Sequence, residues 1–175
     1  FSAMKGLIIF AHGSGSSRKS PRNQMVATQL NKAGFGTLLF DLLTNPEAEN
    51  RKNVFDIEFL SNRLVAVTKW VRQQSDLKNT PLGYFGASTG AGAAIQAASK
   101  LLLSSDVGVY AIVSRGGRPD LAGEALKIVK VPTLLLVGSL DVGVIELNRH
   151  AHNLLSNSKL IIVPGATHLF DEPGT

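Results

Sequence analysis

Short runs of apolar residues alternate with longer amphipathic segments along the chain, and this alternation constrains the fold more than any other feature. The apolar runs lie at 7–10, 37–40, 82–85, 107–113, 131–137 and 159–163. Runs this short and this apolar are typical of strands buried on both faces, as in parallel sheets covered by helices. The sequence therefore predicts an α/β fold: a three-layer sandwich with a mostly parallel sheet of about six strands and helices on both faces.

The segments between these runs have the spacing of helices. Apolar residues recur at intervals of three and four from 57 to 71, which places them on one helix face: Ile57, Leu60, Leu64, Val67 and Val71. A helix after the first strand is expected to begin at Ser20-Pro21 and to end at Gly34. Further helices are expected near 89–103, 119–129 and 142–156, and the polar stretch 44–53 is expected to form a surface loop.

Composition narrows the class of protein. The chain has 175 residues, of which 44% are hydrophobic, enough for a single domain over 1–175 with its own core. It has no Cys, which excludes disulfides, thiolate metal sites and a cysteine nucleophile. No His, Asp or Glu residues show the spacing of metal ligands, so no metal site is expected. Residues 1–3, which precede Met4, are set aside as a candidate vector remnant.

Charge and hydropathy bear on location and partners. No apolar run approaches the roughly 20 residues that span a bilayer, and no signal peptide is visible, so we expect a cytoplasmic protein with no membrane partner. The net charge is +5, but the basic residues are scattered and only 6% of residues are aromatic. This pattern does not favour nucleic-acid binding, whereas a mildly basic surface would attract anionic substrates.

The stretch Gly86-Ala87-Ser88-Thr89-Gly90 carries the strongest functional signal. It follows the apolar run 82–85 and precedes a segment of small residues expected to be helical, so the serine stands at a sharp turn from strand to helix. Such a turn strains the serine backbone and leaves no room for a Cβ two residues before or after it. The N-terminus of the following helix favours negative charge beside the serine.

Further along the chain, an acid and a histidine follow later strands. Asp141 follows the run 131–137, and His168 follows the run 159–163. Parallel strands end at the same edge of a sheet, so these side chains are expected near Ser88. His168 would act as base toward Ser88, and Asp141 would orient the imidazole. Asp171 and Asp41 are alternative acids, and Asp141 could instead cap the helix that follows it.

Attack on a carbonyl also needs donors for the developing oxyanion. The backbone N–H groups of Thr89 and Ser14 are the natural pair, since Ser14 lies in the glycine-rich loop after the first strand. His12 is either a possible substrate-binding residue of that loop or a structural one. His150 and His152 fall in a predicted helix and are expected at the surface.

Arginines near the predicted strand ends are candidates for binding an anionic group. Arg115 and Arg118 lie among glycines after the fourth strand, so they could bind a carboxylate or phosphate of the substrate. Alternatively, these arginines pair with local acids such as Asp120 or Glu124. Arg18 and Arg22, just past the glycine-rich loop, are similar candidates for the same role.

Taken together, these segments resemble the α/β-hydrolase superfamily, in its dienelactone-hydrolase-like branch. The resemblance extends over nearly the whole chain and rests on residues 10–18, 86–90, 114–122, 131–141 and 163–170. The combination is similar to a bacterial group of small hydrolase domains sometimes fused to phosphoribosyltransferase-like domains. It implies hydrolysis of small carboxylic esters through an acyl-serine intermediate without a cofactor, with Ser88 as nucleophile, Asp141 as acid and His168 as base.

Two features depart from that pattern. Dienelactone hydrolases use a cysteine where this chain has Ser88, so dienelactone is not the expected substrate. The family usually has one or two strands before residue 7 and a helix after the His168 loop, so the chain is either minimal or trimmed at its ends. A sheet face left open in this way could pair with a second copy, giving a homodimer.

The short connections between the predicted strands leave no room for a large lid, so an open pocket suited to small esters is expected. Two alternatives to an esterase stay open. One is a thioesterase or acyltransferase with the same three residues, and the other is a non-catalytic binding or regulatory domain on the same scaffold.

Overall fold

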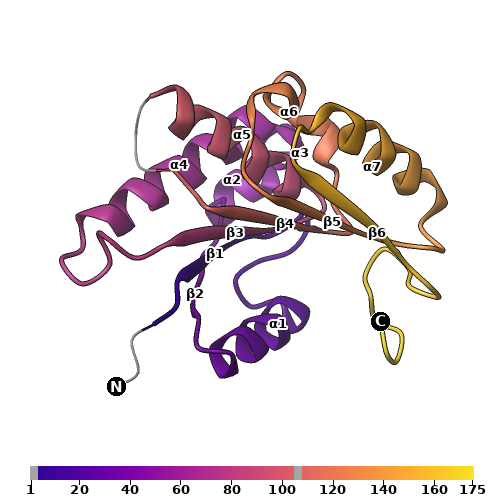
Figure 1. Cartoon of the computed structure of the whole chain (residues 1–175), viewed down its shortest axis with the longest axis horizontal. Coiled ribbons are helices and arrows are strands. Elements are labelled where there is room, and N and C mark those ends of the chain that lie inside the picture. Colours follow the sequence, from indigo (N-terminus) through magenta and orange to yellow (C-terminus); the bar gives the residue numbers. More distant parts are fainter. Residues whose placement is uncertain (1–3, 105–107) are drawn as a thin grey trace.

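Six parallel strands form a single sheet in the order β2-β1-β3-β4-β5-β6 (Figure 1). The computed structural model describes residues 4–104 and 108–175. The strands are β1 (Leu7–Ala11), β2 (Gly36–Leu39), β3 (Leu82–Ala87), β4 (Ala111–Arg115), β5 (Thr133–Gly138) and β6 (Ser158–Val163). The strand order reverses at β1, so the carboxyl ends of β1 and β3 flank the crevice where ligands bind in such sheets.

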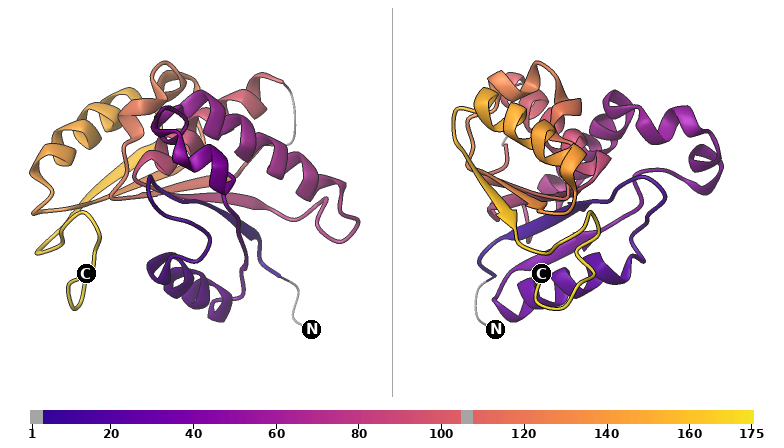
Figure 2. Two further views of the ribbon diagram at one scale, coloured as in Figure 1. Left: turned by 180° about the vertical axis from the view of Figure 1, so that it is seen from behind. Right: turned by 90° about the vertical axis from the view of Figure 1, so that its right-hand side faces the viewer.

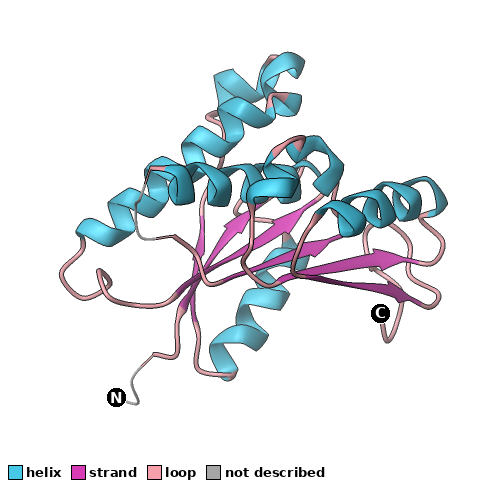
Figure 3. Cartoon of the chain, turned by 45° about the horizontal axis from the view of Figure 1, so that its top comes forward, coloured by secondary structure: helices cyan, strands magenta, loops and turns pink. Residues whose placement is uncertain are grey.

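Helices cover both faces of the sheet, which confirms the three-layer prediction. Helix α1 (Pro21–Lys32) lies alone on one face, and α4 (Ile57–Gln73), α5 (Thr89–Leu103) and α7 (Val142–Leu154) lie on the other (Figures 1 and 2). The remaining helices are short: α2 (Asn45–Glu49), α3 (Arg51–Phe55), the 3-10 helix η1 (Pro119–Ala122) and α6 (Ala125–Ile128). Figure 3 shows the sheet between the two helical layers.

The core is divided by the sheet into a larger and a smaller part. The larger part lies between the sheet and α4 and α5, where the apolar face predicted for 57–71 is buried at Ile57, Leu60, Leu64 and Val71. All six residues of β3 are buried. The smaller part lies under α1 and centres on Phe10, Ala27 and Phe85, whose two phenyl rings stack 4.9 Å apart. The strand that leads to Ser88 is therefore packed on both of its faces.

Several sequence-based boundaries were wrong, among them the start of the strand predicted over 131–137, which begins at Thr133. The strand predicted over 107–113 corresponds to β4, which begins only at Ala111, the first residue of its ladder with β3; Val107 lies outside the described residues. The helix predicted near 119–129 is divided into η1 and α6 by Gly123, whose φ is +56°. The helix predicted over 142–156 ends at Leu154.

The stretch 44–53, predicted as a loop, contains α2 and the start of α3. Pro46 stands in the first turn of α2, where its missing N–H costs nothing. The Glu47 carboxylate accepts a hydrogen bond of 2.8 Å from the Thr44 N–H, as in a capping box. The prediction of a loop overlooked this signal of a helix start, a Thr and a Glu three positions apart.

Within residues 4–104 and 108–175, the connections at the carboxyl edge of the sheet include no large lid. Over the same residues, none of the helices combines the length and the apolar character needed to cross a membrane.

Candidate active site

Ser88 stands in a strained turn between β3 and α5. Its φ of +49° and ψ of −125° lie outside the regions that residues with a side chain normally adopt. The turn is held by hydrogen bonds to the Ser88 carbonyl from the N–H groups of Arg118 (2.9 Å) and Ala91 (3.1 Å). Strain of this kind persists only where the surroundings fix it, and Ser88 lines a cavity at this edge of the sheet.

The glycines on either side of Ser88 allow close backbone approach. A Cβ on Gly86 would lie 2.5 Å from the Ala91 Cα, and a Cβ on Gly90 would overlap the Ala11 carbonyl oxygen at the end of β1. A larger residue at Gly86 would push against the start of α5, and one at Gly90 would push the turn away from β1. The small residues predicted from the motif therefore have a direct steric cause.

His168 and Asp141 form a hydrogen-bonded pair, with 2.6 Å between His168 Nδ1 and Asp141 Oδ2. Asp141 occupies the N-cap position of α7, but its side chain makes no capping hydrogen bond there. The alternative acids are engaged elsewhere, since Asp171 pairs with Arg22 and Asp41 pairs with Arg18. Of the three acids considered from the sequence, the structure brings Asp141 to His168.

Backbone hydrogen bonds hold the two loops that carry this pair. The Leu140 N–H donates to the Ala166 carbonyl (3.0 Å) and the Ser139 N–H to the Val163 carbonyl (2.9 Å). Beyond them, the Glu172 carboxylate accepts hydrogen bonds from the Thr167 hydroxyl and N–H. These bonds lower the pKa of Glu172 and fix the turn that contains His168.

The glycine-rich loop after β1 lies directly against Ser88. A Cβ on Gly13 would lie 2.8 Å from the Ser88 Cβ, so only a glycine allows this contact. Within the described residues, the N–H groups of Ser14 and Thr89 donate to no protein acceptor. Two free N–H groups beside a serine are what an oxyanion site requires.

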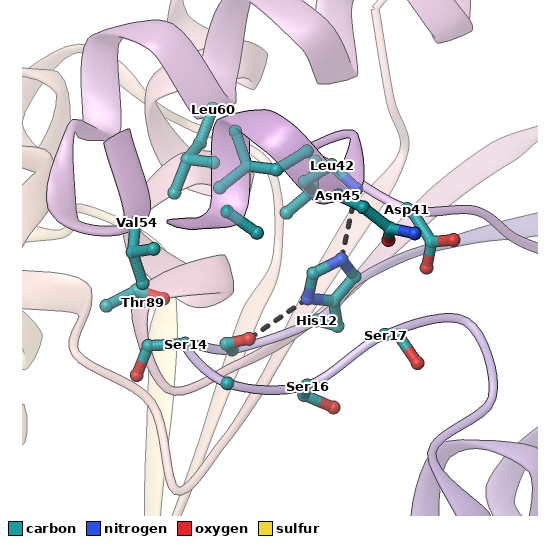
Figure 4. A pocket seen from close by; sticks show the side chains of 14 residues that line it. His12, Ser14, Ser16, Ser17, Asp41, Leu42, Asn45, Val54, Leu60 and Thr89 are labelled. Carbon is teal, nitrogen blue, oxygen red and sulfur yellow. Dashed lines mark hydrogen bonds between the residues drawn. The ribbon is translucent and has the colours of Figure 1, made fainter. Parts of the chain in front are cut away.

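His12 uses both ring nitrogens in local hydrogen bonds (Figure 4). Its Nε2 accepts from the Leu42 N–H at 3.0 Å, so Nδ1 carries the proton and donates to the Gly13 carbonyl, also at 3.0 Å. The ring is buried and joins the loops that follow β1 and β2. This arrangement matches the structural alternative for His12 and gives the ring a positioning role for the glycine-rich loop.

Two cavities lie on the two sides of the glycine-rich loop. The first, about 280 Å³, is lined by His12, Asp41 and the apolar side chains of Leu42, Val54 and Leu60 (Figure 4). The second, about 200 Å³, is lined by Ser88, His168, Arg22 and Arg115. Both cavities include Gly13 and Ser14 in their walls. Ser88 and His168 thus face one cavity, although no hydrogen bond joins them in the described part of the chain.

The arginine candidates divide into two groups. Arg118 makes a bidentate pair with Asp120, at 2.9 and 2.8 Å, and these bonds raise its pKa; it lines neither cavity. Arg115 lines the cavity beside Ser88, donates to Asn23 Oδ1 at 3.3 Å and lies over the Phe85 ring. Arg22 lines the same cavity. Sequence reasoning gave Arg22 little weight because its place in the first turn of α1, after the glycine-rich loop, was the only signal.

The remaining sequence candidates lie away from this site. His150 is exposed on α7, and His152 shares a hydrogen bond of 2.7 Å with the Ser158 hydroxyl. No cluster of His, Asp and Glu with the geometry of a metal site occurs in residues 4–104 or 108–175.

A parallel sheet with a strained serine turn at its carboxyl edge is the architecture of the α/β hydrolases. A family model described as an alpha/beta hydrolase domain matches residues 4–174, so the chain belongs to this family. The crystal structure of a dienelactone hydrolase from Anabaena variabilis ATCC 29413 is 50% identical to it, with a TM-score of 0.91, over 99% of this chain and 81% of that chain. The dienelactone-hydrolase-like character predicted from the sequence is therefore confirmed.

More distant structures share the fold. Est1E from Butyrivibrio proteoclasticus is 17% identical with a TM-score of 0.78, over 97% of this chain and 82% of that chain. Two curated relatives, from two strains of Mycobacterium tuberculosis, are 58% identical over 172 residues, which is 98% of this chain. Each is named "Putative phosphoribosyl transferase", and the chain spans 38% of their length. That name is consistent with the fusion that the resemblance implied. The similarities as a whole support a hydrolase.

Proposed function

We propose that this chain is a serine hydrolase that cleaves small carboxylic esters through an acyl-enzyme intermediate on Ser88. The observation that supports the proposal most directly is the 2.6 Å hydrogen bond between His168 and Asp141, with His168 and Ser88 in the wall of one cavity. Serine is a weak nucleophile near neutral pH and needs an adjacent base. Because Asp141 holds Nδ1, the other ring nitrogen of His168 is left to take the serine proton.

In the proposed reaction, Ser88 Oγ bonds to the ester carbonyl carbon while its proton passes to His168 Nε2. The carbonyl oxygen becomes an oxyanion, which accepts hydrogen bonds from the N–H groups of Ser14 and Thr89. When the tetrahedral intermediate collapses, the bond to the alcohol oxygen breaks and His168 returns the proton to that oxygen. Water then repeats the sequence on the acyl-enzyme and releases the acid. The hydrogen bond between serine and histidine, absent from the described structure, tightens in such sites when substrate binds.

The test compares hydrolysis of p-nitrophenyl butyrate by the unchanged protein and by Ser88→Ala. We expect the substitution to lower kcat by at least about 10⁴-fold, because the residual rate comes only from binding and the oxyanion donors. The matched control is Ser156→Ala, which changes an exposed serine far along the chain and should leave the rate unchanged.

Reaction with a fluorophosphonate, followed by intact-protein mass spectrometry, separates a hydrolase from a binding domain. The expected result is one adduct on the unchanged protein and none on Ser88→Ala. A folded protein that neither hydrolyses the ester nor takes the label would contradict the proposal and favour a non-catalytic domain on this scaffold.

A further inference from the structure

The cavity beside Ser88 contains more positive charge than the described protein groups around it balance. Arg22 enters it from the first turn of α1, and Arg115 enters from the end of β4. Four other arginines each pair with a carboxylate of their own: Arg18 with Asp41, Arg63 with Glu47, Arg118 with Asp120 and Arg149 with Glu146. In the described part of the chain, Arg115 has no carboxylate within ion-pair distance.

The one carboxylate near the two arginines is weakly engaged. Arg22 Nη1 lies 3.4 and 3.3 Å from the Asp171 oxygens, and the Asp171 side chain is 51% exposed. The pKa of Arg115 is lowered, first by burial and then by the charge of Arg22, with Asp171 acting in the opposite sense. Holding two guanidinium groups together in a partly dry cavity therefore has an energetic cost that the described protein groups do not offset.

Unused hydrogen-bond donors lie in the same place. The Nε atoms of Arg22 and Arg115 are both buried and have no partner within the described structure. A buried donor without an acceptor is destabilising, and both of these donors belong to arginines that line the cavity beside Ser88. Asn23, buried beside them, accepts one bond of 3.3 Å from Arg115 and holds that side chain over Phe85.

We infer that Arg22 and Arg115 form a subsite for an oxyanion group of the substrate, a carboxylate or a phosphate. The planar guanidinium carries donors in a fork that matches such groups. Asp171 then acts as a displaceable counterion that partly shields the arginines when the subsite is empty. This inference rests on the proposed function and specifies its substrate class: esters that carry a second, anionic group.

The geometry also limits the size of that substrate. Ser88 and both arginines line one cavity of about 200 Å³, so only a few bonds can separate the ester carbonyl from the anionic group. The apolar part of the substrate has the other cavity available, across the glycine-rich loop, where Leu42, Val54 and Leu60 contribute to the wall. A short hemi-ester fits this arrangement, whereas a long neutral lipid leaves both arginines unsatisfied.

The first test measures the ratio of kcat/KM for mono-p-nitrophenyl glutarate to that for p-nitrophenyl pentanoate. The two esters have the same leaving group and differ by the terminal carboxylate. Arg115→Met and Arg22→Met each keep an apolar stem, and each is expected to lower the ratio 10- to 100-fold, chiefly through KM for the glutarate ester. Arg149→Met, which removes the same charge from the exposed face of α7, should leave the ratio unchanged. Arg22 is less buried than Arg115, so Arg22→Met is expected to fold. The test can therefore be made with Arg22→Met if Arg115→Met does not fold.

Asp171→Asn is expected to change the ratio of kcat/KM values in the opposite direction. If Asp171 competes with the substrate for the two arginines, its removal raises the ratio several-fold, whereas a purely structural role for the Arg22–Asp171 pair predicts no rise. A ratio that stays the same in Arg22→Met, Arg115→Met and Asp171→Asn would overturn the subsite.

Binding to Ser88→Ala separates the subsite from the hydrolysis. Titration of this variant with glutarate, and separately with inorganic phosphate, is followed by isothermal calorimetry. The inference requires that at least one of the two anions binds and that adding Arg115→Met weakens this binding at least tenfold; the tighter anion identifies the group. If the ester is not hydrolysed but this result holds, the proposed function fails and the subsite stands. If hydrolysis proceeds but neither anion binds, the subsite fails and the proposed function stands.

Discussion

At the scale of single residues, Asp141 occupies a position that suits two different structural roles. It stands where a helix cap is expected, yet its carboxylate is 2.6 Å from His168 and makes no capping bond to α7. A helix N-terminus can lose a cap for roughly 1 kcal/mol, whereas a histidine without its acid loses its orientation and its tautomer. The sequence left both roles open because each needs an Asp at that position.

Under the proposed mechanism, Asp141→Asn should lower kcat by about 10⁴-fold while KM changes little, because the amide keeps the shape but favours the wrong imidazole tautomer. Steady-state kinetics with p-nitrophenyl butyrate check this, with Asp76→Asn on the exposed surface as the matched control. A loss of less than tenfold would mean that another group orients His168.

The sequence identified the residues around Ser88 better than the arginines beside it. Ser88, Gly86 and Gly90 follow from a local motif, since backbone crowding within a few residues fixes their identity. Arg22 and Arg115 are far apart in the sequence and line one cavity only because α1 packs against the sheet. No local sequence pattern predicts that the two side chains lie close together. The choice between Arg115 and Arg118 depended on whether Arg118 pairs with Asp120, as it does in the structure.

At the scale of elements, helix α1 connects the fold to the site. Ser20 caps it, accepting a hydrogen bond of 3.3 Å from the Asn23 N–H, and Pro21 occupies the first turn. The same turn carries Arg22 and Asn23, two of the polar groups of the inferred subsite. The cap therefore fixes the direction in which these side chains enter the cavity.

Ser20→Ala should destabilise the protein by about 1 kcal/mol, the usual cost of a lost N-cap. If α1 also positions the subsite, the substitution will raise KM for mono-p-nitrophenyl glutarate more than KM for the neutral pentanoate ester. Urea unfolding and the two sets of kinetics check the two effects separately. A stability loss with equal changes in both KM values would show that the cap acts on the fold alone.

Element types were more predictable than element ends. The strands and the long helices have periodicities that differ clearly, and α5 has the bounds expected for it, Thr89–Leu103. The predicted bounds of β4 and of the helix after it were wrong: β4 pairs with β3 only from Ala111, and the left-handed backbone of Gly123 divides the helix. Such ends depend on tertiary contacts that a propensity does not contain.

At the scale of the whole molecule, the architecture follows from the apolar pattern of the strands. Strands buried on both faces are apolar throughout, and this pattern alone predicted the parallel sheet and its helical layers. The order β2-β1-β3-β4-β5-β6 adds the crevice where the carboxyl ends of β1 and β3 diverge, and both the glycine-rich loop and the Ser88 turn lie there. The location of the site is thus a property of the topology, while its chemistry belongs to the individual loops.

Acid sensitivity is a property of the whole molecule as well. Among residues 4–104 and 108–175, three carboxyl groups have pKa values below their ordinary range. Burial works against ionisation of Asp41, but the hydrogen bonds and charge of Arg18 outweigh it. Hydrogen bonds from Thr44 lower the pKa of Glu47, and hydrogen bonds from Thr167 lower that of Glu172. A carboxyl group with a lowered pKa in the folded state stabilises the fold when ionised, so its contribution is present above the unfolded value, near pH 4.

This contribution should disappear as the pH falls from about 4 through the lower, folded-state values. The triple variant Asp41→Asn, Glu47→Gln, Glu172→Gln should unfold at a lower urea concentration than the unchanged protein at pH 7. The gap between the two midpoints should then narrow steadily below about pH 4. The gap is the informative quantity, because the net charge of +5 grows on acidification and destabilises both proteins by self-repulsion. A gap of constant size from pH 7 to pH 3 would mean that these three side chains act through packing rather than through their charge.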